Sequence, residues 1–366
     1  MGFLRKIKNV LPVSSRSFHS FRTAEEERLN LLLQEIRQQQ DFNKVSYEAL
    51  ARAVDSLSND LDAHDTHIKM FAWENYRKSN ETLIDAKKRF FKELPSTTGS
   101  SRLIQIGCTK LLSEFNSVCA SSGLSYWAGG GTLIGAIRHN GFIPWDDDVD
   151  LCMLRRDISK LKTELASSDE FKLSIVFDPF VICCQYRFMF LDEDIPCFLD
   201  IFPFDYAYDF KSRSALDSLR NKLMNDLASK DYYPEWLKRG CIEEDDPIAS
   251  QVKQIFMEYL QKATDDHLIN IQGEESCIVR GIDNFDDPNG YHWSSKTNEV
   301  FPLEWVKFEN TEIAIPKNYN ELLEGAYGDI YSLPKDINTH FDHIAGAVDD
   351  QTETDKALKI KLGLLK

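Results

Sequence analysis

The chain has 366 residues, of which 42% are hydrophobic and 28% are charged, and its net charge is −16 at pH 7. Such a length allows one large domain or two smaller ones. The negative charge argues against a nucleic-acid-binding protein, because such proteins need a basic surface to displace counterions. No run of 18 apolar residues occurs, so we expect no transmembrane helix.

The first 22 residues differ from the rest, because they carry five cations and no acid. Phe3, Leu4, Ile7, Val10 and Leu11 fall at roughly helical spacing among these cations. This pattern predicts an amphipathic segment on an anionic membrane surface, and the alternative is a disordered basic tail. There is no apolar core that would make the segment a secretory signal.

Residues 23–93 predict a helical oligomerisation region. Apolar residues recur at a 4-3 spacing from Leu29 to Phe71, with polar interruptions at Gln40, Asn43 and His64. Sustained heptads indicate a coiled coil and therefore a homo-oligomer, and the alternative is a long helix packed on its own domain. The Pro-, Ser- and Gly-rich residues 94–101 predict a linker that ends this region.

Residues 102–366 alternate between helical and extended patterns, which predicts a second, larger domain. We expect helices over 104–118, 155–166, 213–229 and 249–264, and strands over 124–128, 149–153, 172–177, 181–191 and 196–202. The region 277–345 predicts short strands, turns and one helix. The eight cysteines contain no C-x-x-C pair and lie mostly among apolar neighbours, which predicts reduced core residues of a cytoplasmic protein rather than disulfides or a zinc site.

A glycine-rich turn follows the strand at 124–128. Gly129, Gly130 and Gly131 precede Thr132, which we expect to cap a helix over 133–138. Such a turn brings backbone N–H groups close to a phosphate, where the helix dipole favours an anion. Alone the signal is weak, since glycine turns between strand and helix also occur for structural reasons alone.

The next feature is the acidic run "DDDVD" at residues 146–150. In an extended chain, Asp146, Asp148 and Asp150 share one face, where their carboxylates can bind divalent cations. An EF-hand is disfavoured because Leu151 occupies the position that needs glycine. Asp200 lies alone in the apolar stretch "CFLDIFPFD" and needs a metal or a basic partner if it is buried. Two aspartates on one strand and one on its neighbour are the set with which polymerase-type nucleotidyltransferases hold two Mg²⁺ ions.

Three segments together resemble the LicD family, which includes the fukutin-related glycan phosphotransferases. They are "YWAGGGTLIGAIRHNGFIPWDDDVDL" from Tyr126, "FLDIFPFD" from Phe198, and the stretch from Phe301 to Pro334. The resemblance covers roughly residues 102–345. It implies an α+β, nucleotidyltransferase-like mixed sheet flanked by helices, here preceded by the long N-terminal coiled-coil helix. It also implies transfer of phosphocholine, glycerol phosphate or ribitol phosphate from a CDP-activated donor to a glycan hydroxyl.

Carried over by position, the resemblance assigns Asp146, Asp148, Asp150 and Asp200 to two Mg²⁺ ions, with Mn²⁺ as the alternative metal. Asp148, Asp150 and Asp200 would be the catalytic residues, and Asp200 would accept the proton of the acceptor hydroxyl. The donor phosphate would contact Gly130, Gly131, Thr132 and Arg138. His139 could assist there, and the alternative for it is a structural hydrogen bond. The partners implied are a CDP-alcohol, a glycan or lipid-linked oligosaccharide, and the inner face of the cytoplasmic membrane through residues 1–22.

Several alternatives remain open from the sequence. The same carboxylates serve enzymes that transfer a nucleotide from a triphosphate, and a coiled-coil scaffold would need no catalysis. Tyr126, Trp127 and Trp145 form either a choline cage or part of the core. Tyr327, Gly328 and Asp329 line the donor site or belong to a capping element. His340 and His343 have no assigned role, because the segment "DINTHFDH" lacks the basic residues expected there.

Overall fold

The computed structural model describes residues 23–31, 44–192, 195–209, 212–284, 294–332, 355–356, 358–360 and 362–365. The basic segment 1–22, part of the heptad region (32–43), and His340 and His343 therefore lie outside the described residues. The chain divides into two compact units, residues 1–90 and 91–366, and each is considered by itself.

The first unit contains a long helix over the second part of the heptad region, but a coiled coil is not confirmed. Helix α3 spans Lys44–Tyr76, and α4 spans Leu83–Lys92, across the boundary between the units. Three apolar heptad residues of α3 are well exposed, with Leu57 at 52%, Ile68 at 39% and Phe71 at 53%. An exposed apolar stripe at this spacing suits a coiled coil, but self-association stays a prediction.

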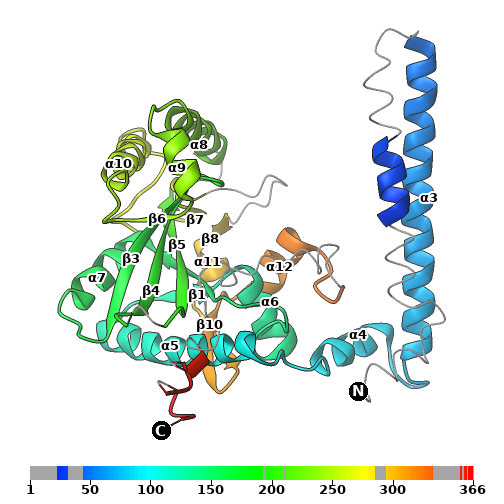
Figure 1. Ribbon diagram of the computed structural model, residues 1–366, viewed down its shortest axis with the longest axis horizontal. Coiled ribbons are helices and arrows are strands. Elements are labelled where there is room, and N and C mark those ends of the chain that lie inside the picture. The colour runs from blue at the N-terminus through cyan, green and yellow to red at the C-terminus, as the bar shows by residue number, and fades with distance from the viewer. Residues whose placement is uncertain are drawn as a thin grey trace. The chain divides into compact units, whose positions relative to one another are not determined.

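The second unit is built on one mixed sheet of eight strands, in the order β1-β2-β5-β4-β3-β6 with β7 and β8 beyond β5 (Figure 1). Its strands are β1 (Tyr126–Ala128), β2 (Asp150–Leu154), β3 (Phe171–Asp178), β4 (Cys183–Phe190), β5 (Phe198–Ala207), β6 (Ile242–Glu243), β7 (Cys277–Arg280) and β8 (Ser295–Lys296). The pairing of β2 with β5 is parallel, and the other pairings in this sheet are antiparallel. A mixed sheet flanked by helices is therefore confirmed.

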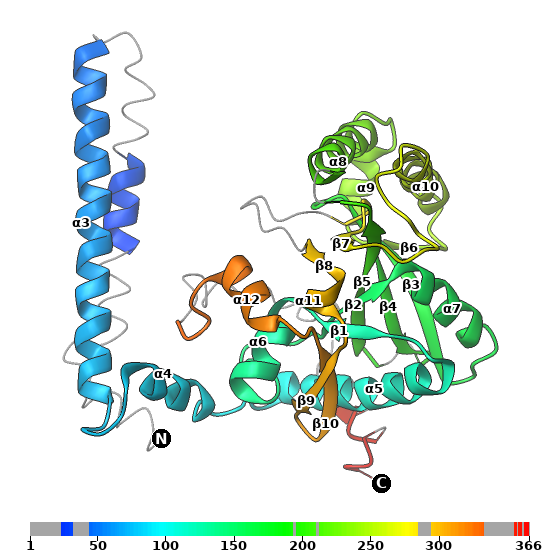
Figure 2. The same ribbon diagram turned by 180° about the vertical axis from the view of Figure 1, so that it is seen from behind.

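Helices pack on one face of this sheet, because alternate strand residues on that face are large and apolar. Leu151 of β2, Leu199 and Ile201 of β5 and Phe188 of β4 are fully buried there. The covering helices are α5 (Ser100–Ser122), α7 (Arg155–Leu165), α8 (Ser212–Ala228), α9 (Tyr233–Arg239) and α10 (Ala249–Asp265). Helices α5 and α7 cover one end of the strands and α8 to α10 the other (Figure 2).

The opposite face is apolar only in part. Trp127, Cys152, Leu154 and Phe204 form a cluster with Val300 of the short helix α11 (Thr297–Val300). On the same face, Asp150 and Asp200 lie at the other end of β2 and β5, two residues before Cys152 and Phe202. The sheet thus presents its carboxylates on the face that the large helices leave uncovered.

The remaining elements lie beside the sheet. They are α6 (Gly130–His139), the hairpin strands β9 (Glu304–Phe308) and β10 (Thr311–Ile315), and α12 (Tyr319–Tyr327). Strands β9 and β10 form a hairpin, which helix α12 follows, and β10 packs beside α5 and β1. Three expectations are corrected. Helix α5 begins at Ser100, inside the expected linker, and α9 was not expected. The described part of residues 277–345 holds two helices, α11 and α12, rather than one.

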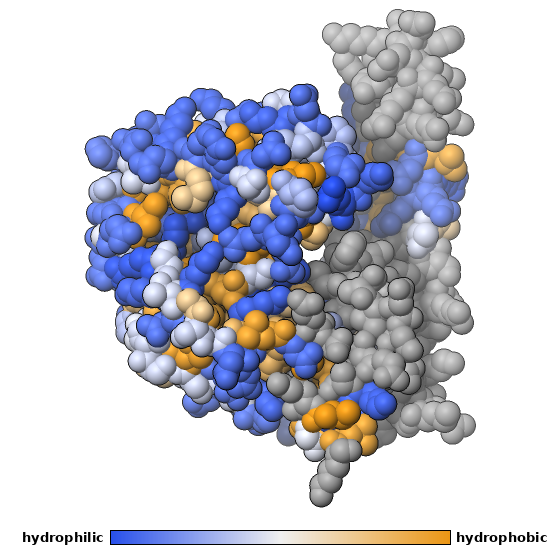
Figure 3. Space-filling model, turned by 60° about the vertical axis from the view of Figure 1, so that its left-hand side comes forward, coloured by the Kyte–Doolittle hydropathy of each residue, from blue (hydrophilic) through white to orange (hydrophobic). Residues whose placement is uncertain are grey.

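Three general features of the described residues can be compared with the sequence: the surface, the cysteines and the apolar character of the helices. In the view of Figure 3, hydrophilic residues predominate and apolar residues form small separate groups. All eight cysteines are free, and seven of them are buried, as expected for reduced core residues. Within the described ranges, none of the helices has both the length and the apolar character needed to cross a membrane.

Candidate active site

Three carboxylates meet at the uncovered face of the sheet. Asp148, Asp150 and Asp200 each offer one oxygen, and these oxygens lie within 4.8 Å of one another. The parallel register of β2 and β5 places Asp150 directly opposite Asp200, and Asp148 comes from the loop before β2. Within the described residues, this is the one cluster of at least three acidic, His or Cys side chains with such spacing.

The structure brings these residues together in a different way from the one predicted. Strand β2 begins at Asp150, so Asp146 and Asp148 are not alternate residues of a strand. Asp148 reaches the cluster through the loop conformation. Asp146 lies outside the cluster, and its carboxylate is beside Gly131 at the start of α6. Metal binding by Asp146 is therefore less well supported than binding by the other three aspartates.

Burial makes this cluster electrostatically unfavourable without a cation. Burial raises the pKa of Asp150 well above its usual value, and the nearby charges of Asp148 and Asp200 raise it further. Arg187 relieves part of this repulsion, because it lies opposite Asp200 on β4 and its Nε donates to Asp200 Oδ1 at 2.9 Å. Burial alone would lower the pKa of Arg187, but the charge of Asp200 and this hydrogen bond raise it overall.

The glycine turn is joined to the acidic strand by one backbone hydrogen bond and by one bond to a side chain. Gly129 N–H donates to the Asp150 carbonyl at 3.0 Å, and the Asp150 N–H donates to Thr132 Oγ1 at 2.8 Å. Helix α6 begins at Gly130 with Gly129 as its N-cap, so the expectation that Thr132 caps the helix is wrong. Thr132 instead fixes the first residue of β2 against the helix.

Gly130 and Gly131 allow carboxylates to approach the start of α6. A Cβ on Gly131 would lie 2.7 Å from Asp146 Oδ2, and a Cβ on Gly130 would meet Asp150 Oδ2 more closely still. Gly130 also has a φ of 49°, in the left-handed region that favours glycine. The missing side chains therefore let the acidic cluster and a helix N-terminus share one small space, in which the helix dipole favours negative charge.

We expect Gly130→Ala to impair both stability and activity. The methyl group would collide with the Asp150 carboxylate, and alanine at positive φ adds strain of about 1 kcal/mol. Displacing Asp150 by about 1 Å is expected to lower the turnover number roughly a hundredfold. Thermal unfolding and steady-state rates measure the two effects. Gly325→Ala, where a Cβ would meet nothing within 4 Å, is the matched control and should leave the rate unchanged; an equal loss there would contradict the steric argument.

Arg138 and His139 lie at the far end of α6 from Gly130, about 12 Å along the helix at 1.5 Å per residue. Arg138 stacks 4.3 Å from the centre of the Phe91 ring, donates from Nε to His139 Nε2 at 2.9 Å, and hydrogen-bonds the Ile330 carbonyl. Burial, with the charge of Arg138, lowers the pKa of His139 to about 4, so His139 is neutral at pH 7. These contacts hold both side chains in place, and their binding of the donor phosphate stays a prediction.

Two arginines near the cluster were not predicted from the sequence. Arg187 pairs with Asp200, and Arg280 of β7 lies opposite Phe204 on the face that carries Asp200. The Arg280 guanidinium lies 5.1 Å from the centre of the Phe202 ring, and its charge counteracts the rise in the pKa of Asp150. Both arginines lie in segments with an extended pattern, which did not by itself mark them as site residues. The strand pairing that brings them near the aspartates cannot be predicted from one sequence.

The remaining candidate site residues from the sequence are three aromatic residues and the residues at the end of α12. Tyr126 and Trp127 are buried in two different apolar clusters, and Trp145 packs against the cluster that contains Tyr126, so a core role fits better than a choline cage. Gly328 follows the last residue of α12, Tyr327, and its N–H donates to Glu324. Asp329 Oδ1 accepts from the Tyr331 N–H at 2.9 Å, which fits a structural turn.

Converging carboxylates on the open face of a mixed sheet, beside a glycine-rich helix N-terminus, define a nucleotidyltransferase-type domain. Residues 123–222 match the profile described as "LicD/FKTN/FKRP, nucleotidyltransferase domain". The resemblance predicted from the sequence is thereby confirmed for residues 123–222, which are similar to this family.

Three similar proteins align with this chain over different lengths. The chain is 26% identical over 259 residues to the "Lipopolysaccharide cholinephosphotransferase LicD" of Haemophilus influenzae, which is 66% of this chain and 96% of that protein. It is 49% identical over 41 residues to "Ribitol 5-phosphate transferase FKRP" of Homo sapiens, which is 11% of this chain and 8% of that protein. An uncharacterized protein of Rickettsia typhi is 27% identical over 107 residues, which is 27% of this chain and 35% of that protein.

Proposed function

We propose that this protein transfers a phospho-alcohol, such as phosphocholine, glycerol phosphate or ribitol phosphate, from a CDP-activated donor to a hydroxyl of a glycan, with release of CMP. The observation that carries the proposal is the convergence of Asp148, Asp150 and Asp200 beside the glycine turn of a domain that is similar to the LicD family. The names of the relatives support the type of group transferred and the kind of acceptor.

We further propose that the three aspartates hold Mg²⁺, with Mn²⁺ as the alternative. The donor set fits, because carboxylate oxygens are the ligands that these hard cations prefer. The raised pKa of Asp150 also fits, since a bound cation would offset the repulsion that raises it. When bound, such a cation neutralises phosphate charge and polarises the phosphorus that is attacked.

In this proposal, the Arg187–Asp200 ion pair, the N-terminus of α6 and Arg280 each have a different role. The ion pair with Arg187 holds the Asp200 carboxylate in a fixed orientation and occupies Oδ1, which suits a metal ligand better than a proton acceptor. The N-terminus of α6 directs its backbone N–H groups and its dipole towards the anionic donor. Arg280 supplies a guanidinium on the same face, near Phe202, where it can pair with a donor phosphate.

We expect Arg280→Ala to raise the KM for the CDP-alcohol about tenfold to a hundredfold, which corresponds to one hydrogen-bonded charge pair. Arg280→Lys should recover part of the loss, because lysine keeps the charge but lacks the forked geometry. Arg156 is the matched control: it lies 5.2 Å from the centre of the Tyr206 ring but pairs with Glu274. An unchanged donor KM in Arg280→Ala, or an equal change in Arg156→Ala, would remove Arg280 from the donor site.

Product analysis separates this function from its rivals. The full-length protein is incubated with Mg²⁺, a glycan acceptor and each of CDP-choline, CDP-glycerol and CDP-ribitol, and CMP is measured. Release of CMP that depends on the acceptor is expected with one of these donors. Pyrophosphate release from a nucleoside triphosphate would instead indicate a nucleotidyltransferase. Failure of all donors and triphosphates would favour the non-catalytic scaffold.

Two further parts of the proposal concern the N-terminal region. We propose that α3 pairs with copies of itself, because its heptad residues Leu57, Ile68 and Phe71 are exposed.

We also propose that the basic residues 1–22 attach the protein to the inner face of the cytoplasmic membrane, where lipid-linked glycans are accessible. Deleting residues 1–22 should then release the protein from anionic vesicles.

A further inference from the structure

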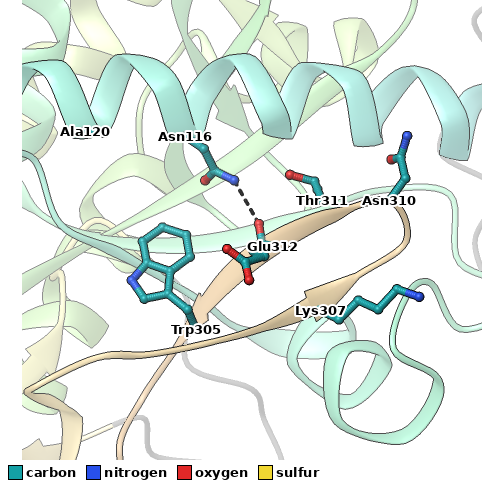
Figure 4. A pocket seen from close by; sticks show the side chains of 7 residues that line it. All are labelled: Asn116, Ala120, Trp305, Lys307, Asn310, Thr311 and Glu312. Atoms are coloured by element: carbon teal, nitrogen blue, oxygen red, sulfur yellow. Dashed lines mark hydrogen bonds between the residues drawn. The ribbon is translucent and has the colours of Figure 1, made fainter.

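A pocket separate from the aspartates lies in the same unit, on the other side of the sheet. It is about 670 Å³ in volume and lies between the second half of α5 and the β9–β10 hairpin (Figure 4). Asn116 of α5 lines it, as do Trp305 and Lys307 of β9 and Thr311 and Glu312 of β10. Helix α5 packs on the face of the sheet opposite to Asp150 and Asp200, so this pocket is separate from the candidate active site. Its volume is in the range typical of small-molecule sites.

The wall of this pocket is a tryptophan that is exposed but held in position. Trp305 is 51% exposed, and its ring meets the buried Tyr126 ring edge to face at 6.0 Å and 89°. The Tyr126 hydroxyl donates to Asn116 Oδ1, and Asn116 Nδ2 donates to the Glu312 carbonyl at 2.8 Å. Trp305 is therefore anchored to a fixed network that connects α5, β1 and the hairpin. A rigid aromatic surface binds a ligand at little cost in conformational entropy.

The hairpin also carries polar groups that line the pocket and are not used by the fold. Lys307 and Glu312 are directly opposite in the hairpin register, where an ion pair would be expected. Within the described residues, neither head group has an ion-pair partner. Figure 4 shows why: the Glu312 carboxylate points towards Trp305, whereas Lys307 extends away along its strand. The hydroxyl of Thr311 likewise has no hydrogen bond in the described part of the chain. The pocket therefore has an acid beside the aromatic ring, and a hydroxyl and a base further along the hairpin (Figure 4).

We propose that this pocket binds a pyranose ring of a glycan, in addition to the sugar that reacts at the aspartates. A pyranose has an apolar C–H face, which can pack on the indole, and a rim of hydroxyl groups that both donate and accept hydrogen bonds. The carboxylate of Glu312 beside Trp305 matches such a rim, and Thr311 and Lys307 line the rest of the pocket. A nucleotide fits less well, because Glu312 would repel its phosphate at the ring edge. The assignment of the sugar to the acceptor glycan rests on the proposed function.

Binding can be tested without turnover. Full-length protein with ¹⁵N-labelled tryptophan, free of donor and metal, is titrated with the methyl glycosides of glucose, galactose, mannose and N-acetylglucosamine. We expect at least one glycoside to shift the indole N–H signal of Trp305 saturably in the millimolar range, with that signal assigned by its loss in Trp305→Phe. Ligand-observed saturation transfer should disappear in Trp305→Ala and weaken at least fivefold in Glu312→Gln. It should persist in Asp148→Asn, because the pocket is separate from the aspartates.

A lack of any saturable shift of the Trp305 signal, with every glycoside up to tens of millimolar, would overturn the sugar site. Equal binding by wild type and Trp305→Ala would do the same. Tyr208→Ala, which removes another exposed aromatic ring, is the matched control and should bind as wild type does. If a glycoside binds but no CDP-alcohol is turned over, the sugar site is supported and only the proposed function is ruled out.

The role in transfer has its own readout. With a polymeric glycan acceptor, Trp305→Ala should raise the acceptor KM about tenfold and leave kcat unchanged, because the lost contact is remote from the reacting atoms. With a monosaccharide acceptor, the same variant should behave as wild type. An equal effect on both acceptors, or an effect on kcat alone, would contradict a sugar subsite that extends the acceptor site.

Discussion

Asp148→Asn and Asp150→Asn are each expected to abolish transfer while the protein stays folded. Each change removes one of the three carboxylates whose oxygens converge within 4.8 Å. A metal ligand supplies several kcal/mol of transition-state stabilisation, so a loss of about a thousandfold or more in kcat/KM is expected. Release of CMP from the CDP-alcohol measures this loss, and circular dichroism monitors the fold.

The stability of Asp150→Asn gives the prediction a second readout. Burial and the neighbouring charges raise the pKa of Asp150, so the charged form destabilises the folded protein. In chelator, stability should therefore fall as the pH rises from about 4, the usual carboxyl value, to the raised pKa of Asp150. Asp150→Asn removes this fall, and its melting temperature at pH 7 should exceed that of the metal-free wild type. Mg²⁺ should stabilise the wild type but not this variant.

Asp157→Asn provides the matched control for both readouts. Asp157 is as deeply buried as Asp200 but lies in the first turn of α7, where its partner is Lys160. Its loss should cost about 1 kcal/mol of stability, as expected for an acid near a helix N-terminus, and should leave transfer intact. Full activity of Asp148→Asn or Asp150→Asn would remove the proposed mechanism.

Arg155→Leu is expected to produce the largest loss of stability. Arg155 follows β2 directly and forms a buried pair with Asp205 of β5, at 2.8 Å, and with Asp283 after β7, at 2.7 Å. Removing the guanidinium leaves two buried carboxylates without their cation, which typically costs about 3–5 kcal/mol. For a domain of this size, that loss corresponds to a decrease of roughly 10 °C in melting temperature. Calorimetry or thermal circular dichroism measures the decrease.

The same ion group also positions the site. It ties together β2, β5 and β7, which carry Asp150, Asp200 and Arg280 respectively. Activity below the melting temperature should therefore fall in Arg155→Leu. The triple change of Arg155, Asp205 and Asp283 to leucine should regain much of the stability, because no charge is left unpaired. Arg156→Leu, which loses only a pair with the exposed Glu274, should change stability by less than about 1 kcal/mol. A similar loss in both single variants would show that the buried group is not the cause.

Local sequence patterns predicted most of the elements of the second unit. The alternation of apolar residues over 172–177 and 181–191 matches β3 and β4, because each strand buries one side against helices. The 3.6-residue pattern over 104–118 matches α5 for the same reason. The patterns failed at Thr132 and at Asp146 to Asp148. In both places a long-range contact decided the conformation: Thr132 bonds to Asp150, and Asp146 lies against Gly131.

The sequence by itself determined the chemistry of the site. The carboxylates of Asp148, Asp150 and Asp200 and the glycines before α6 are all recognisable from residue type and spacing, because metal and phosphate binding require those groups. Only the tertiary structure decided which residues meet. The parallel register of β2 and β5 sets Asp150 opposite Asp200, and the pairing of β5 with β4 and β7 adds Arg187 and Arg280. The pocket at Trp305 likewise depends on packing α5 against the hairpin. Strand register and helix packing are set by many weak contacts between distant segments, and no short motif records them.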